Sequence, residues 1–383
     1  MSPRALFVTT VPITLEAFLV PFAEHFRSQG WRVDALANGA STNPHIVNAF
    51  DARFDVAWSR NPLDPRNLLG TSAEVRRIVA EGDYDIVHVH TPIAAFVTRW
   101  ALRRLTGPAK PVVIYTAHGF HFYRGQRRTP HALFRTMERI AARWTDYLVT
   151  INREDFEAAR RFRGIPAERV RYIPGIGVDV TRFGEGAVTP GEAAAVRREL
   201  DVPPEAFMLT MIAELAPVKR HAHVLDALSR TRDLRTVLVL VGEGILEPEL
   251  REEARKLRLT DRVRFAGYRR DIPAVLAASD ALVLVSEREG LPRSVLEALA
   301  AGRPVIGTKT RGITDALDAG SGWIVDKGDA AALAAAIDHA ASHPDEVVRR
   351  GHAARLRAET EFALPRIISA YEELYREALA SRV

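Results

Sequence analysis

Short apolar runs alternate with longer amphipathic stretches along most of the chain. The apolar runs of the first half are often rich in β-branched residues and predict strands. The stretches between them have hydrophobic positions at helical spacing and predict helices. This alternation is typical of a parallel sheet with helices packed on its faces. We expect strands over residues 4–10, 31–37, 84–90, 112–118 and 147–152, and helices over 15–29, 93–105 and 134–142.

The same alternation begins again after a turn-rich segment at residues 184–191, which contains three glycines and a proline. The second half predicts strands over 207–213, 236–241, 263–267, 281–285 and 304–308, and helices over 224–230, 246–257, 272–278 and 294–301. Because each half predicts its own parallel sheet, the fold class is α/β with two Rossmann-like domains. We expect domains over 1–180 and 205–362, a linker over 181–204 and a C-terminal helix over 363–383.

The length and composition agree with a two-domain globular protein. A chain of 383 residues is too long for one ordinary core, and 47% of its residues are hydrophobic and 26% charged. The absence of cysteine excludes disulfides, thiolate metal ligands and a cysteine nucleophile, and it suits a reducing cytoplasm. Acidic Glu16 and Glu24 soon follow the first apolar run, so we expect a strand and a helix there, not a signal peptide. No apolar run approaches the length of a membrane span.

The formal charge is only +5, but basic residues cluster between Arg99 and Arg171, and six arginines fall in one short stretch among several aromatic residues. A charge run on a helix is usually a solvated face. The alternative is an anionic partner, either a membrane surface or a lipid diphosphate. No basic tail or recognition motif supports nucleic acid. The arginines of the cluster are Arg124, Arg127, Arg128, Arg135, Arg139 and Arg143.

Two glutamates flank the start of a predicted helix after the strand that ends near residue 286. Leu291 and Pro292 predict the first turn of that helix, where proline is tolerated. The amides near Gly290 and Leu291 would then form an anion site that suits a diphosphate. A carboxylate accepts hydrogen bonds, so Glu297 can hold a ribose and Glu289 a hexose.

Position supports this interpretation over the simpler one, in which the helix dipole alone favours acidic residues in an early turn. The loop follows a short continuous apolar run, which is typical of a buried parallel strand. Ligands of open α/β sheets bind at the carboxyl ends of such strands.

Basic and glycine-rich segments follow the other predicted strands of the second half. Lys219 and Arg220 can contact phosphates, although a surface loop would also carry such residues. Gly242 and Gly244 fit either a ligand cleft or a plain tight turn. Tyr268 follows the strand over 263–267, where a nucleobase could rest.

In the first half, His118 and His121 follow the strand over 112–118 in a glycine-bearing loop. A histidine there can hydrogen-bond a sugar hydroxyl or a phosphate at neutral pH, and the alternative is a pair of buried structural histidines. Asp83 and Asp85 resemble a metal-binding pair, but they precede their strand, so we expect no metal role for them. We find no metalloprotease motif and no phosphate-binding loop motif.

These segments resemble the family-4 retaining glycosyltransferases of the GT-B fold. Glu289 and Glu297 match the Glu-x7-Glu signature of that family. The loop Ala117-His118-Gly-Phe-His121-Phe-Tyr123 resembles the subgroup that builds bacterial surface polysaccharides on lipid carriers. The resemblance implies two facing Rossmann-like domains with parallel sheets, an interdomain cleft, and a C-terminal helix that crosses back to the first domain.

The resemblance also implies the reaction and its partners. A retaining enzyme of this type moves a hexose or N-acetylhexosamine from a nucleoside-diphosphate sugar, here expected to be a UDP-sugar, to a hydroxyl of a polysaccharide precursor. The acceptor is expected to be a glycan or a polyprenyl-diphosphate-linked sugar, with a small natural product as the alternative. No metal or other cofactor is expected. Such an enzyme would be cytoplasmic, with a peripheral position on the inner face of the membrane as a further expectation.

The residue roles implied by the resemblance divide between the two halves. His118 matches the active-site histidine, and Lys219 matches the lysine on the donor diphosphate. Glu214 stands where many members have arginine, which leaves one phosphate contact open to Arg220. The other expected donor residues are Gly242, Gly244 and Tyr268, and an acceptor or membrane face is expected at His121, Arg124, Arg127 and Arg128. The alternative functions are a sugar-nucleotide epimerase or hydrolase and a degenerate partner that binds a sugar nucleotide without catalysis.

Overall fold

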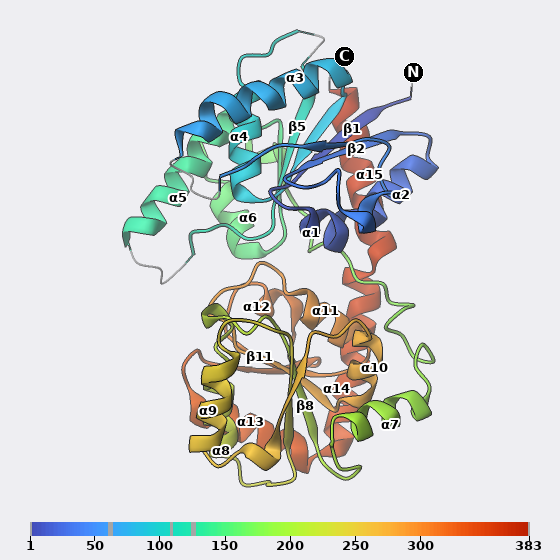
Figure 1. The fold of residues 1–383 in the computed structure, drawn as a ribbon, viewed down its shortest axis with the longest axis vertical. Helices are drawn as coiled ribbons and strands as arrows, with labels where there is room; N and C mark the ends of the chain where they lie inside the picture. The colour runs from blue at the N-terminus through green and yellow to red at the C-terminus, as the bar shows by residue number, and fades with distance from the viewer. Residues whose placement is uncertain (1, 60–63, 108–109, 124–127, 382–383) are drawn as a thin grey trace. The chain divides into compact units, whose positions relative to one another are not determined.

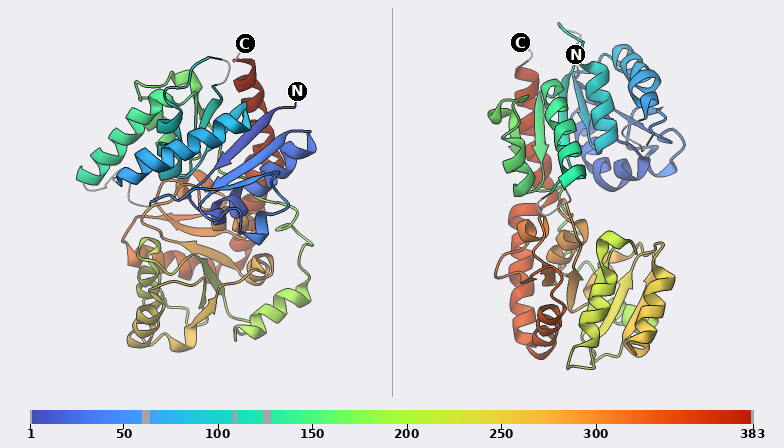
Figure 2. Two further views of the ribbon diagram at one scale, coloured as in Figure 1. Left: turned by 45° about the horizontal axis from the view of Figure 1, so that its top comes forward. Right: turned by 90° about the vertical axis from the view of Figure 1, so that its left-hand side faces the viewer.

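The computed structural model describes residues 2–59, 64–107, 110–123 and 128–381. The chain divides into two compact units, which Figures 1 and 2 show in colours that run along the sequence. Unit 1 consists of Met1–Ile176 and Ile367–Val383, and unit 2 consists of Gly177–Arg366. No helix in the described ranges is long and apolar enough to cross a membrane.

Unit 1 is built on a parallel sheet with the strand order β3-β2-β1-β4-β5-β6-β7. Its strands are β1 (Arg4–Val8), β2 (Arg32–Ala37), β3 (Arg53–Asp55), β4 (Ile86–Val89), β5 (Val112–Ala117), β6 (Tyr147–Thr150) and β7 (Val170–Tyr172). Its α-helices are α1 (Pro12–Thr14), α2 (Val20–Ser28), α3 (Ser72–Gly82), α4 (Pro92–Leu102), α5 (Arg128–Ala141), α6 (Arg153–Ala159) and most of α15 (Leu364–Ala380). Single turns of other helix types lie at Leu15–Leu19, Pro44–Ile46, Asn67–Thr71, Ala142–Trp144 and Ala167–Arg169.

Helices cover both faces of this sheet, which explains why its central strands are apolar throughout. Buried side chains of α3, α4 and α6 share one core with the strands. On α2, Phe22 packs edge-on against Tyr371 of α15, and Phe26 stacks on Tyr375 of α15. Figure 1 shows α3 and α4 on one side of the sheet and α2 and α15 on the other. Helix α5 lies on the same side of the sheet as α3 and α4 and packs against α4.

Unit 2 is built on a second parallel sheet with the order β10-β9-β8-β11-β12-β13. Its strands are β8 (Met208–Ile212), β9 (Val237–Val241), β10 (Val263–Gly267), β11 (Ala281–Leu284), β12 (Val305–Thr308) and β13 (Gly322–Val325). Its α-helices are α7 (Pro190–Glu199), α8 (His221–Ser229), α9 (Glu247–Lys256), α10 (Ile272–Ala278), α11 (Arg293–Ala300), α12 (Ile313–Ala316), α13 (Ala330–Ser342) and α14 (Pro344–Arg357). Single turns lie at Pro217–Lys219, Thr260–Arg262 and Ala358–Phe362.

The strand order of each sheet reverses at its first strand. In unit 1 the chain runs outward from β1 to β3 and then returns to the other side of β1 at β4. In unit 2 it runs from β8 to β10 and returns beside β8 at β11. The loops at the carboxyl ends of these neighbouring strands part at the reversal, which is where open α/β sheets hold ligands. All ten predicted strands overlap observed ones, whereas β3, β7 and β13 were not predicted.

Residues 181–204, which we expected to form a linker, are part of unit 2. Thr189 and Glu192 form a capping box at the start of α7, and α7 packs against α10. The C-terminal helix α15 starts within unit 2, where the Leu364 amide donates to the Val178 carbonyl at 2.9 Å. From Ile367 onward it belongs to unit 1.

Candidate active site

An ion pair joins the two loops at the strand reversal of unit 2. Lys219 lies in the loop after β8 and Glu289 in the loop after β11, and β8 and β11 are neighbours in the sheet. Lys219 Nζ lies 2.7 Å from Glu289 Oε1. The exposed fractions of the two side chains are 24% and 10%. The sequence therefore placed both residues at the same edge of the sheet, and the structure brings their charges into direct contact.

Hydrogen bonds fix the backbone of the Glu289 loop. The Arg311 guanidinium donates from Nε to the Glu289 carbonyl at 3.1 Å, and the Thr310 hydroxyl donates to the Ser286 carbonyl at 3.0 Å. The Glu287 amide donates to the Val218 carbonyl at 2.8 Å, which ties this loop to the one that carries Lys219. Buried side chains after β12 thus hold the loop that presents Glu289.

Glu297 is a buried carboxylate in α11, with 6% of its surface exposed. Arg293, one turn earlier, donates from Nε to Glu297 Oε1 at 2.7 Å. Burial raises the pKa of Glu297 above its ordinary value, and the charges of Arg293 and Arg182 only partly oppose this shift. Arg293 was not among the predicted site residues, although its spacing of four from Glu297 is typical of a helical ion pair.

The structure places Pro292 just before the helix α11, not in its first turn. We expected Pro292 in the first turn, but Arg293 is the first helical residue and Pro292 is the N-cap, with an extended backbone. No side chain caps this end. Pro292 has no N–H to donate at this helix start. The nearest amides on its N-terminal side are those of Leu291 and Gly290, and both residues are half-buried in the loop.

Gly242 and Gly244 serve the packing of two loops. A Cβ at Gly242 would lie 2.2 Å from the Ala213 carbonyl oxygen, and one at Gly244 would lie 2.5 Å from the Leu215 carbonyl oxygen. The Leu215 amide donates to the Glu243 carbonyl at 2.9 Å. The glycines therefore allow the loop after β9 to lie directly against the loop that carries Lys219.

The remaining predicted donor residues lie at the same edge of the sheet and are exposed. Arg220 Nε lies 3.6 Å from Glu287 Oε2, and the exposed fraction of its side chain is 53%. Arg220 also has a left-handed backbone, with a φ of 61°. Tyr268 follows β10 and is 66% exposed, and Glu214 follows β8 and is exposed. All three side chains are accessible to a ligand at the carboxyl ends of β8 and β10.

Three histidines form a cluster at the corresponding edge of unit 1. His118 follows β5, His90 follows β4, and His90 Nδ1 lies 3.0 Å from His118 Nε2. The ring of Phe18 stacks on His118 with a centroid distance of 5.5 Å. His88, in β4, lies with its ring 4.1 Å from that of His90. His118 was predicted as a site residue and His90 was not, although His90 has the same signal, a histidine at the end of a buried strand.

Burial keeps these histidines uncharged. It lowers the pKa of His118 from 6.5 to about 4 and that of His88 to about 3, and it holds the pKa of His90 well below its ordinary range. Tyr375 and Thr116 contact the two ring nitrogens of His88. The Nε2 atom of His90 is buried and has no hydrogen-bond partner in the described structure. The cluster therefore presents neutral imidazoles at the mouth of the sheet.

His121 lies apart from this cluster. Its ring lies 5.3 Å from that of Phe134 in α5, and it lines a pocket between α4 and α5. Within α5, Arg135 and Arg139 are exposed, as are Leu133 and Ile140. Arg124 and Arg127 lie outside the described residues, and the side chain of Arg128 is not described.

The aspartates before β4 have a structural role. Asp85 accepts a hydrogen bond from the Arg4 amide at 2.9 Å, at the amino end of the sheet. Asp83 ends α3 with a left-handed backbone. Across the described ranges, no three His, Asp or Glu side chains gather as metal ligands would.

The chain matches two family models, one in each half. The model described as Glycosyltransferase Family 4 matches residues 15–182, and the model described as Glycosyl transferases group 1 matches residues 193–357. EpsD of Bacillus subtilis strain 168, which carries a provisional glycosyltransferase assignment, is 33% identical over 380 residues, or 98% of this chain and 97% of EpsD.

One further relative and one solved structure are also similar to this chain. The UDP-Gal:alpha-D-GlcNAc-diphosphoundecaprenol alpha-1,3-galactosyltransferase of Escherichia coli is 31% identical over 241 residues, or 62% of this chain and 60% of that enzyme. The crystal structure of HepE from Anabaena with UDP and glucose has a TM-score of 0.82 at 21% identity and covers 98% of this chain and 100% of HepE.

Two parallel Rossmann-like sheets with these matches define a glycosyltransferase of the GT-B fold. The chain belongs to the family that joins a family-4 glycosyltransferase domain to a group 1 glycosyl transferase domain. The predictions of the GT-B fold, of a transferase, and of a resemblance to surface-polysaccharide enzymes are confirmed.

Proposed function

We propose that this glycosyltransferase moves a hexose or N-acetylhexosamine from a UDP-sugar to a hydroxyl of a polyprenyl-diphosphate-linked glycan, with retention of anomeric configuration and without a metal. The observation that carries the proposal is the Lys219–Glu289 pair at the strand reversal of unit 2. It places a cation and a hydroxyl acceptor side by side where such a sheet binds its ligand.

The donor is assigned to unit 2 on the chemistry of its loops. Lys219 can hold the diphosphate, with Arg220 as the second cation in place of the arginine that Glu214 replaces. Glu297 can accept the two ribose hydroxyls, and Glu289 can accept hydroxyls of the transferred sugar. The amides of Gly290 and Leu291 would then face the diphosphate near the start of α11.

These groups can stabilise the departing nucleoside diphosphate. Cleavage of the bond from the anomeric carbon to the phosphate oxygen leaves the electron pair on the diphosphate. A fixed lysine and a helix start favour that developing charge more than they favour the bound donor. This is the basis for proposing that no metal is needed. Retention is proposed from the resemblance of Glu289 and Glu297 to the signature of retaining members.

The acceptor is assigned to unit 1, with its hydroxyl near His118. A neutral imidazole can accept the proton of a hydroxyl or orient that hydroxyl by a hydrogen bond. The lowered pKa of His118 keeps it in this form near neutral pH. The Escherichia coli relative acts on a diphosphoundecaprenol-linked sugar, which supports an acceptor of that class.

Exposed residues of α5 support a peripheral position on an anionic membrane. They include Arg135 and Arg139 as well as Leu133 and Ile140. Exposed arginine and apolar side chains on one helix favour binding to anionic headgroups. A lipid-linked acceptor would be reached from that surface, and we propose a cytoplasmic enzyme at the inner face of the membrane.

A transfer assay with EDTA present tests the proposal. Purified enzyme is incubated with UDP-glucose, UDP-galactose or UDP-N-acetylglucosamine and a short-chain polyprenyl-diphosphate sugar, and the anomeric configuration of the product is read by NMR. We expect transfer from one UDP-sugar. Donor consumption without an acceptor would favour an epimerase or hydrolase, and donor binding without any turnover would favour a degenerate partner.

Two variants test the assigned residues. Lys219→Ala and Glu297→Ala should each lower kcat/KM by about tenfold or more, which is roughly 1.4 kcal/mol of transition-state stabilisation. The matched control is Lys256→Ala, since Lys256 is an exposed lysine of the same unit, at the end of α9. If both site variants keep turnover within about threefold, the site assignment is wrong.

A further inference from the structure

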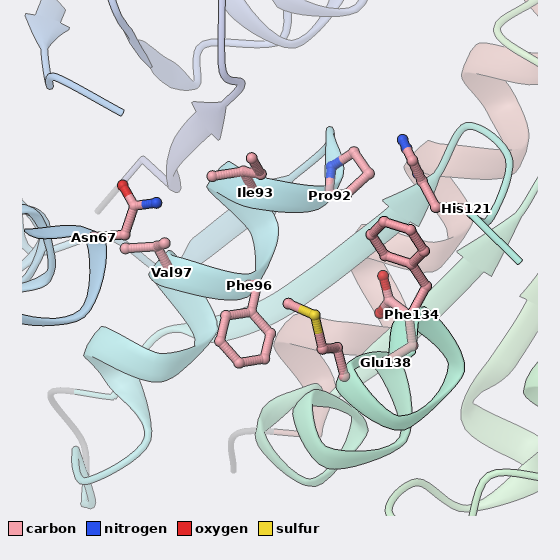
Figure 3. A pocket seen from close by; sticks show the side chains of 9 residues that line it. Asn67, Pro92, Ile93, Phe96, Val97, His121, Phe134 and Glu138 are labelled. Atoms are coloured by element: carbon pink, nitrogen blue, oxygen red, sulfur yellow. The ribbon is translucent and has the colours of Figure 1, made fainter. Parts of the chain in front are cut away.

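A pocket of about 140 Å³ lies between α4 and α5 of unit 1. Figure 3 shows Ile93, Phe96 and Val97 reaching it from α4, and Phe134 from α5. Met137 also lines the pocket from α5. These side chains make the interior mostly apolar, so it favours a hydrocarbon group over water.

The charged group of the lining is neutralised by partners within unit 1. Glu138 accepts a hydrogen bond from the Arg99 guanidinium at 3.1 Å and another from the Tyr115 hydroxyl at 3.0 Å. Arg99 is almost fully buried, with 1% of its surface exposed. Because this carboxylate is paired, the pocket offers no free charge to a ligand that enters it.

The pocket lies at the same edge of the sheet as the histidine cluster. Pro92 lines it and comes two residues after His90, at the end of β4. His121 also lines it and comes three residues after His118, at the end of β5. A ligand bound at His118 could therefore place a neighbouring part of itself in the pocket.

The size of the pocket limits what it can hold. Pockets that enclose a whole drug-sized ligand measure roughly 300–1,000 Å³. A dry cavity of about 150 Å³ in another protein binds benzene. The pocket therefore suits a group of about five or six carbon atoms, which is a fragment of a larger ligand.

The charge near the pocket indicates what that larger ligand is. Arg135 lies three residues before Glu138 in α5, so the two positions are neighbours on the helix, and Arg135 is exposed. An apolar hollow with an exposed arginine beside one of its lining residues is complementary to a molecule with a hydrocarbon chain and a diphosphate. We propose that the pocket binds the isoprene unit next to the diphosphate of a polyprenyl-diphosphate acceptor. This inference rests on the acceptor class given in the proposed function.

Geranyl diphosphate and inorganic diphosphate are the probes for this site. Both are titrated by calorimetry into the full-length protein without donor. We expect geranyl diphosphate to bind at least about tenfold tighter than inorganic diphosphate, because only its hydrocarbon part can enter the pocket. Equal affinities overturn the proposal. Equal competition by a short-chain phosphatidylglycerol overturns the isoprenoid assignment and favours a membrane lipid as the occupant.

Variants that fill the pocket from either helix test whether binding of geranyl diphosphate depends on the pocket. Met137→Phe and Ile93→Phe should each weaken geranyl diphosphate about tenfold and leave inorganic diphosphate unchanged. The control is Leu133→Phe, since Leu133 is 43% exposed and does not line the pocket. If the filling variants bind geranyl diphosphate as the parent does, the pocket is not its site.

A second measurement separates the two proposals. UDP should stabilise the filling variants as much as the parent, because its assigned groups all lie in unit 2. Pocket-dependent binding of geranyl diphosphate by a protein that transfers no sugar would support the pocket while the proposed reaction fails. Sugar transfer to a lipid-linked acceptor with pocket-independent binding would support the reaction and overturn the pocket.

Discussion

Lys219 and Glu289 are 70 residues apart in sequence, and their side chains meet at 2.7 Å across the strand reversal of unit 2. Each is assigned to a different part of the donor, the lysine to the diphosphate and the glutamate to the sugar. A donor that uses both must separate them, so its binding replaces one ion pair with two new sets of contacts. Through this ion pair, the residue assigned to the diphosphate leaving group directly contacts the residue assigned to the transferred sugar.

Replacement of Glu289 by glutamine should lower turnover without weakening nucleotide binding. The amide keeps the shape but removes the charge that holds Lys219, so UDP alone should bind as tightly as to the parent or more tightly. Turnover should fall about tenfold or more, since the glutamine also offers donors where the sugar needs acceptors. Calorimetry with UDP and a steady-state assay measure the two effects. UDP binding weakened by about tenfold would contradict this account of the pair.

Donor affinity should weaken on acidification because of Glu297. Burial raises the pKa of this carboxyl above its ordinary value of 4.5, so it takes up a proton before an exposed glutamate does. A protonated carboxyl accepts hydroxyls less well than a carboxylate. The dissociation constant for UDP, measured from about pH 8 to about pH 5, should rise toward the acidic end. Glu297→Gln should bind UDP more weakly and lose this pH dependence, and an unchanged profile would exclude Glu297 as its source.

The histidine cluster should make the folded protein sensitive to acid. Burial lowers the pKa of His118 from 6.5 to about 4, so the unfolded chain takes up a proton before the folded chain does. His118 therefore has no effect on the pH dependence of the free energy of unfolding above about pH 6.5, and it lowers that free energy as the pH drops toward about 4. His118→Gln should flatten this dependence of the thermal midpoint. The control is His45→Gln, at an exposed histidine, which should leave the pH dependence unchanged.

A methyl group at Gly244 should displace the loop that carries Lys219. The added Cβ would meet backbone atoms of Leu215 at 2.5 to 2.8 Å, which is closer than such atoms approach without a shift of the backbone. We expect Gly244→Ala to lower the thermal midpoint and to weaken UDP binding together. Gly191→Ala is the control, since that Cβ would meet only one side-chain oxygen at 3.9 Å. A Gly244→Ala protein with parent-like stability and affinity would contradict the packing argument.

Loss of Glu138 should destabilise unit 1 through Arg99. The variant Glu138→Ala leaves a buried guanidinium without its carboxylate, which costs about 3–5 kcal/mol of unfolding free energy. The same substitution at Glu81 removes an ion pair in which both side chains are more than half exposed, and it should cost less than about 1 kcal/mol. Urea denaturation of both variants makes the comparison. Equal effects would mean that the Arg99 pair contributes no more than a surface pair.

Local pattern was enough to predict most of the fold. Continuous apolar runs predicted the strands that are covered on both faces, because a parallel strand has no solvent face to mark with polar residues. The short strands β3 and β7 were missed because three residues give too little periodicity to recognise. The helix α7 was interpreted as part of a linker because its turn-rich start hides its capping box.

The sequence by itself determined which elements form and which residues follow each strand, since periodicity and turn chemistry act over neighbouring positions. It placed Lys219, Glu289 and His118 at carboxyl ends of strands. Only the tertiary structure decided that Lys219 meets Glu289 and that His118 meets His90. Such pairings depend on the order of strands in the sheet, and that order is settled by the packing of segments far apart in the chain.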